Sequence, residues 1–239
     1  MDRLLYTAAS GARAALARQD TVAQNLAHAS TPGYRAETAA FRAVPLAGSP
    51  TRVFALDSTT GADFTPGPIQ QTGRPLDVAV SGGGWIAVEG PDGREAYTRA
   101  GNLQVSASGQ LETAGFLLAG GISVPPDAAA RVAPDGTVSA TSAASPAQSL
   151  SLGRIKLVNP PAAMLEKGAD GLFRLKAGGA APEDDNVRLV AGALEGSNVN
   201  VVESLVSMIA LARQFDLQMK LVQNAEANER EASRLLAVT

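Results

Sequence analysis

The sequence predicts an α+β protein in which helices at the two ends of the chain pair as a coiled coil and a central segment forms an all-β domain. Three observations lead to this fold class. Apolar residues recur every three or four positions near both ends. Short runs of alternating apolar and polar residues lie between them, separated by turns that 24 Gly and 14 Pro can supply. Aromatic residues make up only 4% of the 239 residues, so small side chains suited to close helix packing dominate the apolar content.

The first predicted helix carries a heptad-like stripe that is rich in alanine. Such a stripe lets a partner helix approach closely. Pro32 and Gly33 should end the helix near residues 30–33. Asn25 and Thr31 are then helix-end and turn residues, and Gly33 is expected to adopt a positive φ. The stripe consists of Leu5, Ala8, Ala12, Ala15, Gln19, Val22 and Leu26.

The second predicted helix is longer and begins after Asn200. Asn200 is a good N-cap, and Glu203 three residues later completes a capping-box pattern. A second apolar row of Ile209, Leu211 and Leu221 predicts that this helix contacts more than one neighbour. The main stripe consists of Val201, Leu205, Met208, Ala212, Phe215, Met219 and Val222.

Isolated helices are marginal in water, so both terminal helices need packing partners. A terminal helix pair inside one globular protein meets that need. So does a coiled coil that lengthens the subunit and packs against neighbouring molecules. The predicted division is a helical domain from residues 1–40 and 194–239, an extended arm or linker over 41–73, and a β-rich outer domain over 74–193.

The residue types present in this chain do not point to a catalytic, cofactor or metal site. The chain has one histidine, His28, and no cysteine, which excludes common zinc sites and a Cys–His dyad. The glycines after Ser81 lie between predicted strands without a following Gly-Lys-Ser/Thr, so a tight turn is expected rather than a phosphate loop. The carboxylates at 183–185 indicate a solvated turn, with a weak calcium site as the minor alternative. No catalytic, cofactor-binding or metal residue is therefore predicted.

Charge and hydropathy exclude further classes. The 20 Lys and Arg residues are outnumbered by 23 Asp and Glu residues, and no basic run is present, which argues against nucleic-acid binding. The apolar run at 199–212 is too short for a membrane span and contains Asn200 and Glu203. The amphipathic N-terminus lacks the features of a cleaved signal peptide. These features predict a cytoplasmic protein, or one exported by a route that uses no cleaved signal.

Three groups of motifs, in the same order along the chain, resemble the flagellar rod and hook family of axial proteins. The N-terminal motif is NLAHASTPGY at residues 25–34, where His28 stands in place of the family's usual Asn. The C-terminal motif is LEGSNVNVVE at 194–203, continued by MIA at 208–210 and RQF at 213–215. The central motifs are RPLDVAV at 74–80, GWIAV at 84–88 and YTRAGN at 97–102. Within the family, MDRLLYTA at 1–8, FRAVP at 41–45, GALEGSN at 192–198 and FDLQMK at 215–220 resemble proximal-rod members.

The resemblance implies a structural subunit of the proximal rod, a drive shaft for motility, with no enzymatic activity and no cofactor. Its implied partners are other proximal and distal rod subunits and the flagellar type III export apparatus, with no nucleic acid or small-molecule substrate. It implies a basal-body location crossing the periplasm after export without a cleaved signal. The alternatives are a distal-rod subunit, a glycan-acting enzyme of the cell wall, and a secreted adhesin-like β module. The carboxylate pair of such an enzyme is defined by its distance in the folded protein, so sequence spacing alone does not exclude it.

The predicted assembly interface combines the two helix stripes with the residues at the helix ends. Its members are Leu5, Ala8, Ala12, Ala15, Val22, Asn25, Leu26, Thr31, Gly33, Asn198, Asn200, Leu205, Met208, Ala212, Phe215, Met219 and Val222.

Overall fold

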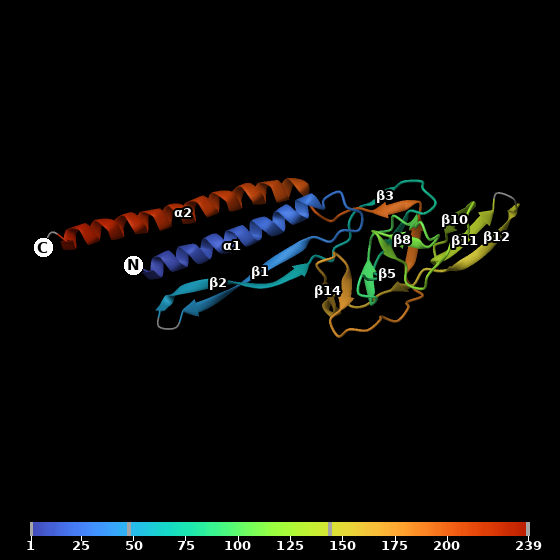
Figure 1. The fold of residues 1–239 in the computed structure, drawn as a ribbon, viewed down its shortest axis with the longest axis horizontal. Helices are drawn as coiled ribbons and strands as arrows, with labels where there is room; N and C mark the ends of the chain where they lie inside the picture. The colour runs from blue at the N-terminus through green and yellow to red at the C-terminus, as the bar shows by residue number, and fades with distance from the viewer. Residues whose placement is uncertain (1, 47–48, 143–144, 238–239) are drawn as a thin grey trace. The chain divides into compact units, whose positions relative to one another are not determined.

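A computed structural model describes residues 2–46, 49–142 and 145–237. Within these residues, long helices stand at both ends of the chain, and strands of two to 14 residues lie between them (Figure 1). The chain is therefore an α+β protein. It divides into two compact units. The helical unit comprises Met1–Ala27, Glu37–Gly61 and Val199–Thr239, and the β unit comprises His28–Ala36 and Ala62–Asn198.

The helical unit is built on α1 (Asp2–Ala27) and α2 (Val201–Ala237), which contact each other. Small side chains face this contact, and Ala8, Ala12 and Ala15 are buried. Gly11 lies against Gln218, because a Cβ at Gly11 would stand 3.2 Å from the side-chain amide carbon of Gln218. The small stripe predicted for the first helix thus permits a close approach of the two helices.

The helical unit also contains a two-stranded sheet of β1 (Glu37–Leu46) and β2 (Ser49–Ala62), which Figure 1 draws beside α1. The segment predicted to be an arm, residues 41–73, contributes to both units. Its first part forms β1 and β2, and its last part includes β3 (Ile69–Gln71) in the β unit. The strands form although this Thr-, Pro- and Gly-rich segment has little periodicity.

The largest sheet of the β unit has five strands in the order β13-β5-β6-β15-β14, and each neighbouring pair is antiparallel. Gly93, with φ +70°, lies in the turn between β5 and β6, at the Pro-Asp-Gly motif. The strands are β13 (Leu157–Val158), β5 (Trp85–Glu89), β6 (Glu95–Thr98), β15 (Phe173–Leu175) and β14 (Leu165–Lys167).

The other sheets of the β unit are smaller, and their strands also pair in antiparallel fashion. Two have three strands: β10 (Ala128–Val132), β11 (Thr137–Ser142) and β12 (Ser145–Arg154); and β7 (Gln104–Val105), β8 (Leu111–Thr113) and β9 (Phe116–Leu117). Two have two strands: β4 (Val78–Ser81) with β16 (Arg188–Ala191), and β3 with β17 (Ala193–Glu195). A 3-10 turn at Ala162–Met164 precedes β14.

Strand β5 separates two apolar clusters. Ile86 and Val88 belong to the larger one, whereas Trp85 and Ala87 belong to the smaller one with Phe173. Successive side chains of a strand point to opposite faces. Both faces of β5 are covered, and this explains why its sequence is continuously apolar.

None of the helices in the described part of the chain is long and apolar enough to cross a membrane.

Candidate assembly surface and buried junction

Helix α2 exposes most of its large apolar side chains. Some of these residues belong to the predicted stripe and others do not. The exposed set is Val201, Val202, Leu205, Val206, Ile209, Leu217, Met219 and Leu221. Large apolar side chains gathered on one element of a water-soluble surface commonly mark an interaction site. We refer to this set as the apolar face of α2.

A different side of α2 is half-buried. Met208, Leu211, Phe215 and Val222 lie on that side, and Ala225 there is buried. The predicted second row grouped Leu211 with Ile209 and Leu221, but Leu211 is half-buried whereas the other two are exposed. Two residues along an α-helix are separated by about 200° around its axis, so Ile209 points to the exposed side when Leu211 points inward.

The predicted stripes are only partly covered. On α1, Val22 and Leu26 are half-buried, in addition to the three buried alanines. On α2, Ala212 is half-buried but Leu205 and Met219 are exposed. The side chain of Leu5 lies outside the described residues. Small side chains on α1 cover little of α2, so its larger residues keep access to solvent.

A hollow of 370 Å³ lies where α1, α2 and β1 meet, within the helical unit. Its lining consists of Arg18, Thr21, Val22 and Asn25 from α1, Glu37 and Ala39 from β1, and Ser207, Ala210 and Leu211 from α2.

Asn200 caps α2 as its position predicts. Its side-chain oxygen accepts hydrogen bonds from the backbone N–H groups of Val202 (3.1 Å) and Glu203 (3.2 Å). These are two of the amides that lack a partner within the helix. The cap fixes where α2 begins.

The other predicted helix-end residues use their polar groups within the chain. Asn25 bonds the backbone of Glu37 twice, donating from Nδ2 at 2.9 Å and accepting at Oδ1 at 2.7 Å. Thr31 Oγ1 lies 3.2 Å from Nδ1 of His28, whose ring stacks on Tyr34. Their place in an assembly interface stays a prediction.

Both the backbone conformation and the close packing at Gly33 require a glycine. Its φ is +68°, as predicted, and a Cβ would stand 2.2 Å from the carbonyl carbon of Arg99. Its N–H donates to the backbone oxygen of Glu195 at 2.7 Å. A side chain here would need both an unfavourable backbone conformation and displacement of its neighbours.

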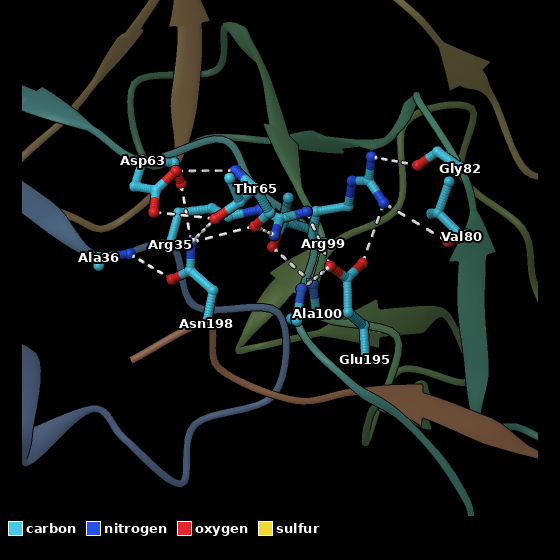
Figure 2. Close-up of polar contacts among 12 residues, drawn as sticks. Arg35, Ala36, Asp63, Thr65, Val80, Gly82, Arg99, Ala100, Glu195 and Asn198 are labelled. Atoms are coloured by element: carbon cyan, nitrogen blue, oxygen red, sulfur yellow. Dashed lines mark hydrogen bonds and ion pairs between the residues drawn. The ribbon is translucent and has the colours of Figure 1, made fainter. Parts of the chain in front are cut away.

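Figure 2 shows a charged junction built entirely from residues of the β unit. Gly33 meets it through the hydrogen bond to the backbone of Glu195. Glu195 Oε1 lies 2.7 Å from Nη2 of Arg35, and its Oε2 lies 2.9 Å from Nη1 of Arg99. The side chains of Arg35 and Glu195 are each 1% exposed, and Arg99 is also buried. Two guanidinium groups thus share one carboxylate away from water.

Backbone groups complete the junction. Arg35 Nη1 donates to the oxygen of Thr65, Arg99 Nη2 donates to the oxygen of Gly82 at 2.8 Å, and Gly67 N–H donates to Glu195 Oε1 at 3.0 Å. The guanidinium of Arg99 also lies 5.3 Å from the centre of the Trp85 ring. Buried charges need such partners because leaving water is costly.

These partners nevertheless do not fully offset the electrostatic cost of burying the charges. Burial lowers the pKa of Arg35, an effect that Glu195 opposes and Arg99 reinforces. Among the described residues, Nε of Arg35 and Nε of Arg99 have no hydrogen-bond partner. Removing the carboxylate would leave two like charges buried together, and this is the costly way to break a buried ion pair.

Asn198 lies next to this junction and ties the same segments together. Its Oδ1 accepts from the N–H of Ala36 at 2.7 Å, and its Nδ2 donates to the backbone oxygens of Asp63 and Thr65, both at 3.0 Å. Asn198 therefore holds the segment that follows α1 against the segments that enter and leave the β unit (Figure 2).

Sequence reasoning missed Arg35, Arg99 and Glu195 as a group. Arg99 and Glu195 stand inside the quoted motifs, and Arg35 directly follows one. Their charge alone indicates a solvated surface, since Arg and Glu are rarely fully buried. Their position inside otherwise apolar or glycine-rich motifs was the available signal.

The remaining candidate sites form local contacts. Asp185 is paired with Arg154 at 2.6 Å, and Asp184 accepts hydrogen bonds from Asn186, which lower the pKa of Asp184. The glycines after Ser81 form the connection between β4 and β5. In the described part of the chain, no three His, Cys, Asp or Glu side chains form a group suited to a metal ion.

Family models match three successive parts of the chain. The model for a flagella basal body rod protein matches residues 5–35, and the model for the FlgE/F/G D1 domain of the flagellar hook protein matches 79–140. The C-terminal model of the flagellar basal body rod FlgEFG protein matches 190–235. The first and third matches contain the motifs at 25–34 and 194–203.

Curated relatives match over the whole chain. The flagellar basal-body rod protein FlgF of Escherichia coli is 44% identical, and that of Salmonella typhimurium is 43% identical, each covering 100% of both chains. The flagellar basal-body rod protein FlgG of Agrobacterium fabrum is 30% identical over 94% of this chain and 95% of its own.

These relatives are structural proteins of the rod, so the alternative of a glycan-acting enzyme has no support. This chain is likewise a structural, non-enzymatic subunit of the flagellar basal-body rod that assembles with other rod subunits. It belongs to the FlgF family of flagellar basal-body rod proteins.

Proposed function

We propose that this subunit occupies the proximal part of the rod and polymerises through α1 and α2, paired as a coiled coil. The observation that carries this proposal is the apolar face of α2. In the proposed rod, residues 1–40 and 194–239 form the core, residues 41–73 an arm, and residues 74–193 the outer β domain. Neighbouring subunits cover the apolar face of α2.

The free energy available from burying the apolar face of α2 is consistent with a polymer in which each subunit contacts several neighbours. Fully burying a Leu, Ile, Val or Met side chain is worth about 1.5–3 kcal/mol, so covering the remaining area of eight half-exposed side chains contributes roughly 8 kcal/mol. Association of two molecules costs about 4–15 kcal/mol before any gain. A single neighbour therefore leaves little surplus, whereas a lattice of several neighbours is stable.

We also propose that the helices gain much of their order on assembly, after export of the unfolded chain by the flagellar type III apparatus into the periplasm. Burial on α1 is provided mostly by alanines, which contribute little apolar area. The chain has no cysteine and so no disulfide to hinder unfolded export. Limited proteolysis of the purified subunit tests the ordering step. Helices as resistant as the β unit would contradict it.

Deletion of the gene followed by imaging of basal bodies tests the role in the rod. We expect membrane rings without a complete rod, hook and filament. A tagged copy at the proximal end supports the proposed position. A tagged copy at the distal end favours the distal-rod alternative, and complete rods in the deletion strain contradict both.

A matched pair of substitutions tests the apolar face of α2 itself. Leu217 on α2 is 62% exposed, and Leu150 on β12 is 61% exposed. Complementing the deletion with Leu217→Gln should reduce swimming, because the side chain no longer has apolar surface to bury against a neighbour. Leu150→Gln is the control. Equal swimming in the two strains counts against the proposed interface.

A further inference from the structure

The buried junction joins the two segments that lead to the helices, and this placement suggests a role beyond stabilising the β unit. We propose that Arg35, Arg99, Glu195 and Asn198 form a clasp that anchors the end of α1 to the start of α2. The inference rests on the proposed function only in taking the α1–α2 pair as the element that polymerises.

Each segment is held by more than one bond. The segment after α1 is fixed through Gly33 N–H to the oxygen of Glu195, through the Arg35 ion pair, and through Ala36 N–H to Asn198. The segment before α2 supplies Glu195 and Asn198. Arg99 reaches the same carboxylate from the end of β6, so the clasp is tied to the core of the β unit.

The clasp shortens the path between the helices. Five residues, 28–32, separate the end of α1 from Gly33, and five more, 196–200, separate Glu195 from α2. If the whole clasp opened, including the bonds from Gly67 to Glu195 and from Asn198 to Asp63 and Thr65, the next tie would be the pairing of β3 with β17, where Ile69 faces Glu195. The β1–β2 pairing and the hydrogen bond from the N–H of Asp63 to the oxygen of Ala36 bypass residues 37–62, so the first connection would grow from five residues to 15, namely 28–36 and 63–68.

Loop-closure cost grows with the three-halves power of loop length. Lengthening the combined connection from ten to 20 residues lowers the effective concentration of α1 at α2 by about threefold. The clasp thus favours the helix pair by about that factor in a free subunit, before any neighbour is present.

The charges make the clasp depend on a nearly complete chain. Arg35 and Arg99 precede Glu195 in the sequence, and both are buried only with its carboxylate between them. A chain that lacks the segment at 195–198 cannot bury the two guanidinium groups without a partner. The anchor of α1 therefore closes only when the residues that lead into α2 have joined the β unit.

Amide hydrogen exchange on the purified full-length subunit tests the clasp independently of any rod. In Glu195→Gln, the amides of Gly33 and Ala36 keep their own acceptors, so faster exchange there reports opening of the clasp. We expect at least tenfold faster exchange at these two amides and about threefold faster exchange along α1 and α2.

The amides of Leu111 and Leu118, bonded to Ile122 and Leu111, report the integrity of the β core and should not change. Glu89→Gln removes an exposed carboxylate of the same unit and should leave the exchange of all these amides unchanged. If Glu195→Gln fails to fold, Asn198→Ala takes its place, with Gly33 and Gly67 as the reporting amides because their acceptors remain.

Unchanged exchange at the reporting amides overturns the clasp. Opened reporting amides with unchanged helices overturn its role in anchoring α1 to α2. Both results are independent of swimming and rod formation, so a failure of the rod proposal leaves them interpretable.

Discussion

The helical unit and the β unit use apolar residues in opposite ways. The β unit encloses large side chains such as Ile86, Leu111 and Phe173 in two clusters. The helical unit buries mainly alanines, and of the 13 large apolar side chains that are exposed among the described residues, nine lie on α1 and α2. The β unit thus carries its own stability, whereas the helices keep apolar surface available for neighbours.

The largest expected difference in unfolding free energy is between Ala substitutions of two leucines, one in each unit. Leu111 is fully buried in the β unit, and its replacement by Ala should cost about 2–5 kcal/mol of unfolding free energy because a cavity remains. Leu205 on α2 is exposed, so Leu205→Ala should cost at most about 0.5 kcal/mol in the free subunit. Denaturant unfolding of both variants measures the difference, and similar losses would break the comparison between the units.

Ala substitutions of two glycines with similar φ measure how much the close approach of Gly33 to the Arg99 backbone matters for stability. Gly33→Ala places a Cβ against the Arg99 backbone at positive φ, and should cost about 2–4 kcal/mol. Gly93 has a similar φ of +70°, but a Cβ there would meet no atom within 4 Å, so Gly93→Ala should cost about 1 kcal/mol. Thermal unfolding of the β unit in each variant gives the two values. Equal losses would mean that the approach of Gly33 to Arg99 is unimportant.

Tyr97 provides an alkaline test of the β unit. Burial raises the pKa of Tyr97 to about 12, and its hydroxyl donates to Glu95 and accepts from the N–H of Ala181. Its ionisation is therefore easier in the unfolded chain, where the pKa is about 10. The contribution of the neutral hydroxyl is present below pH 10 and is lost as the pH rises toward 12, by roughly 2–3 kcal/mol.

Tyr97→Phe should cost about 1–3 kcal/mol at neutral pH, because the Ala181 amide loses its acceptor. The variant should also lose the part of the alkaline decline that Tyr97 causes. Unfolding measured at several pH values from 8 to 12 checks this, since Lys and Arg titrate in both proteins and cancel in the difference. Parallel curves for the two proteins would contradict the role of burial.

The smallest effect concerns the start of α2. Asn200→Ala removes the cap of two helix amides and should cost about 1 kcal/mol of helix stability. Asn224, exposed within the same helix, is the control, because its replacement by Ala removes no cap. Hydrogen exchange in the first turns of α2 measures both variants. Protection that is unchanged in Asn200→Ala would show that the helix start is held by other contacts.

Local chemistry accounts for the features that the sequence predicts well. The start of α2 follows from the Asn200 cap, because its side chain acts on amides of the next turn, whereas α1 ends at Ala27, before the end that Pro32 and Gly33 predict near residues 30–33. The positive φ of Gly33 is also a local property. The α+β class follows from the change of apolar period along the chain.

The β1–β2 sheet could not be predicted in the same way. Its residues carry many Thr, Pro and Gly and little alternation, so the pairing of the two strands depends on their neighbours. Burial decides which side chains of such strands contribute, and burial depends on packing rather than on intrinsic preference.

Residue order alone therefore determines the change from helical to strand periodicity along this chain and the start of α2, since side-chain pattern and hydrogen bonds over a few residues decide both. Packing decides the rest. It places Ile209 toward solvent and Leu211 inward on one helix, and it brings Arg35, Arg99 and Glu195 together from positions up to 160 residues apart. A charge that is solvated and a charge that is buried look alike in a sequence, because the difference lies in the desolvation and pairing that the folded chain imposes.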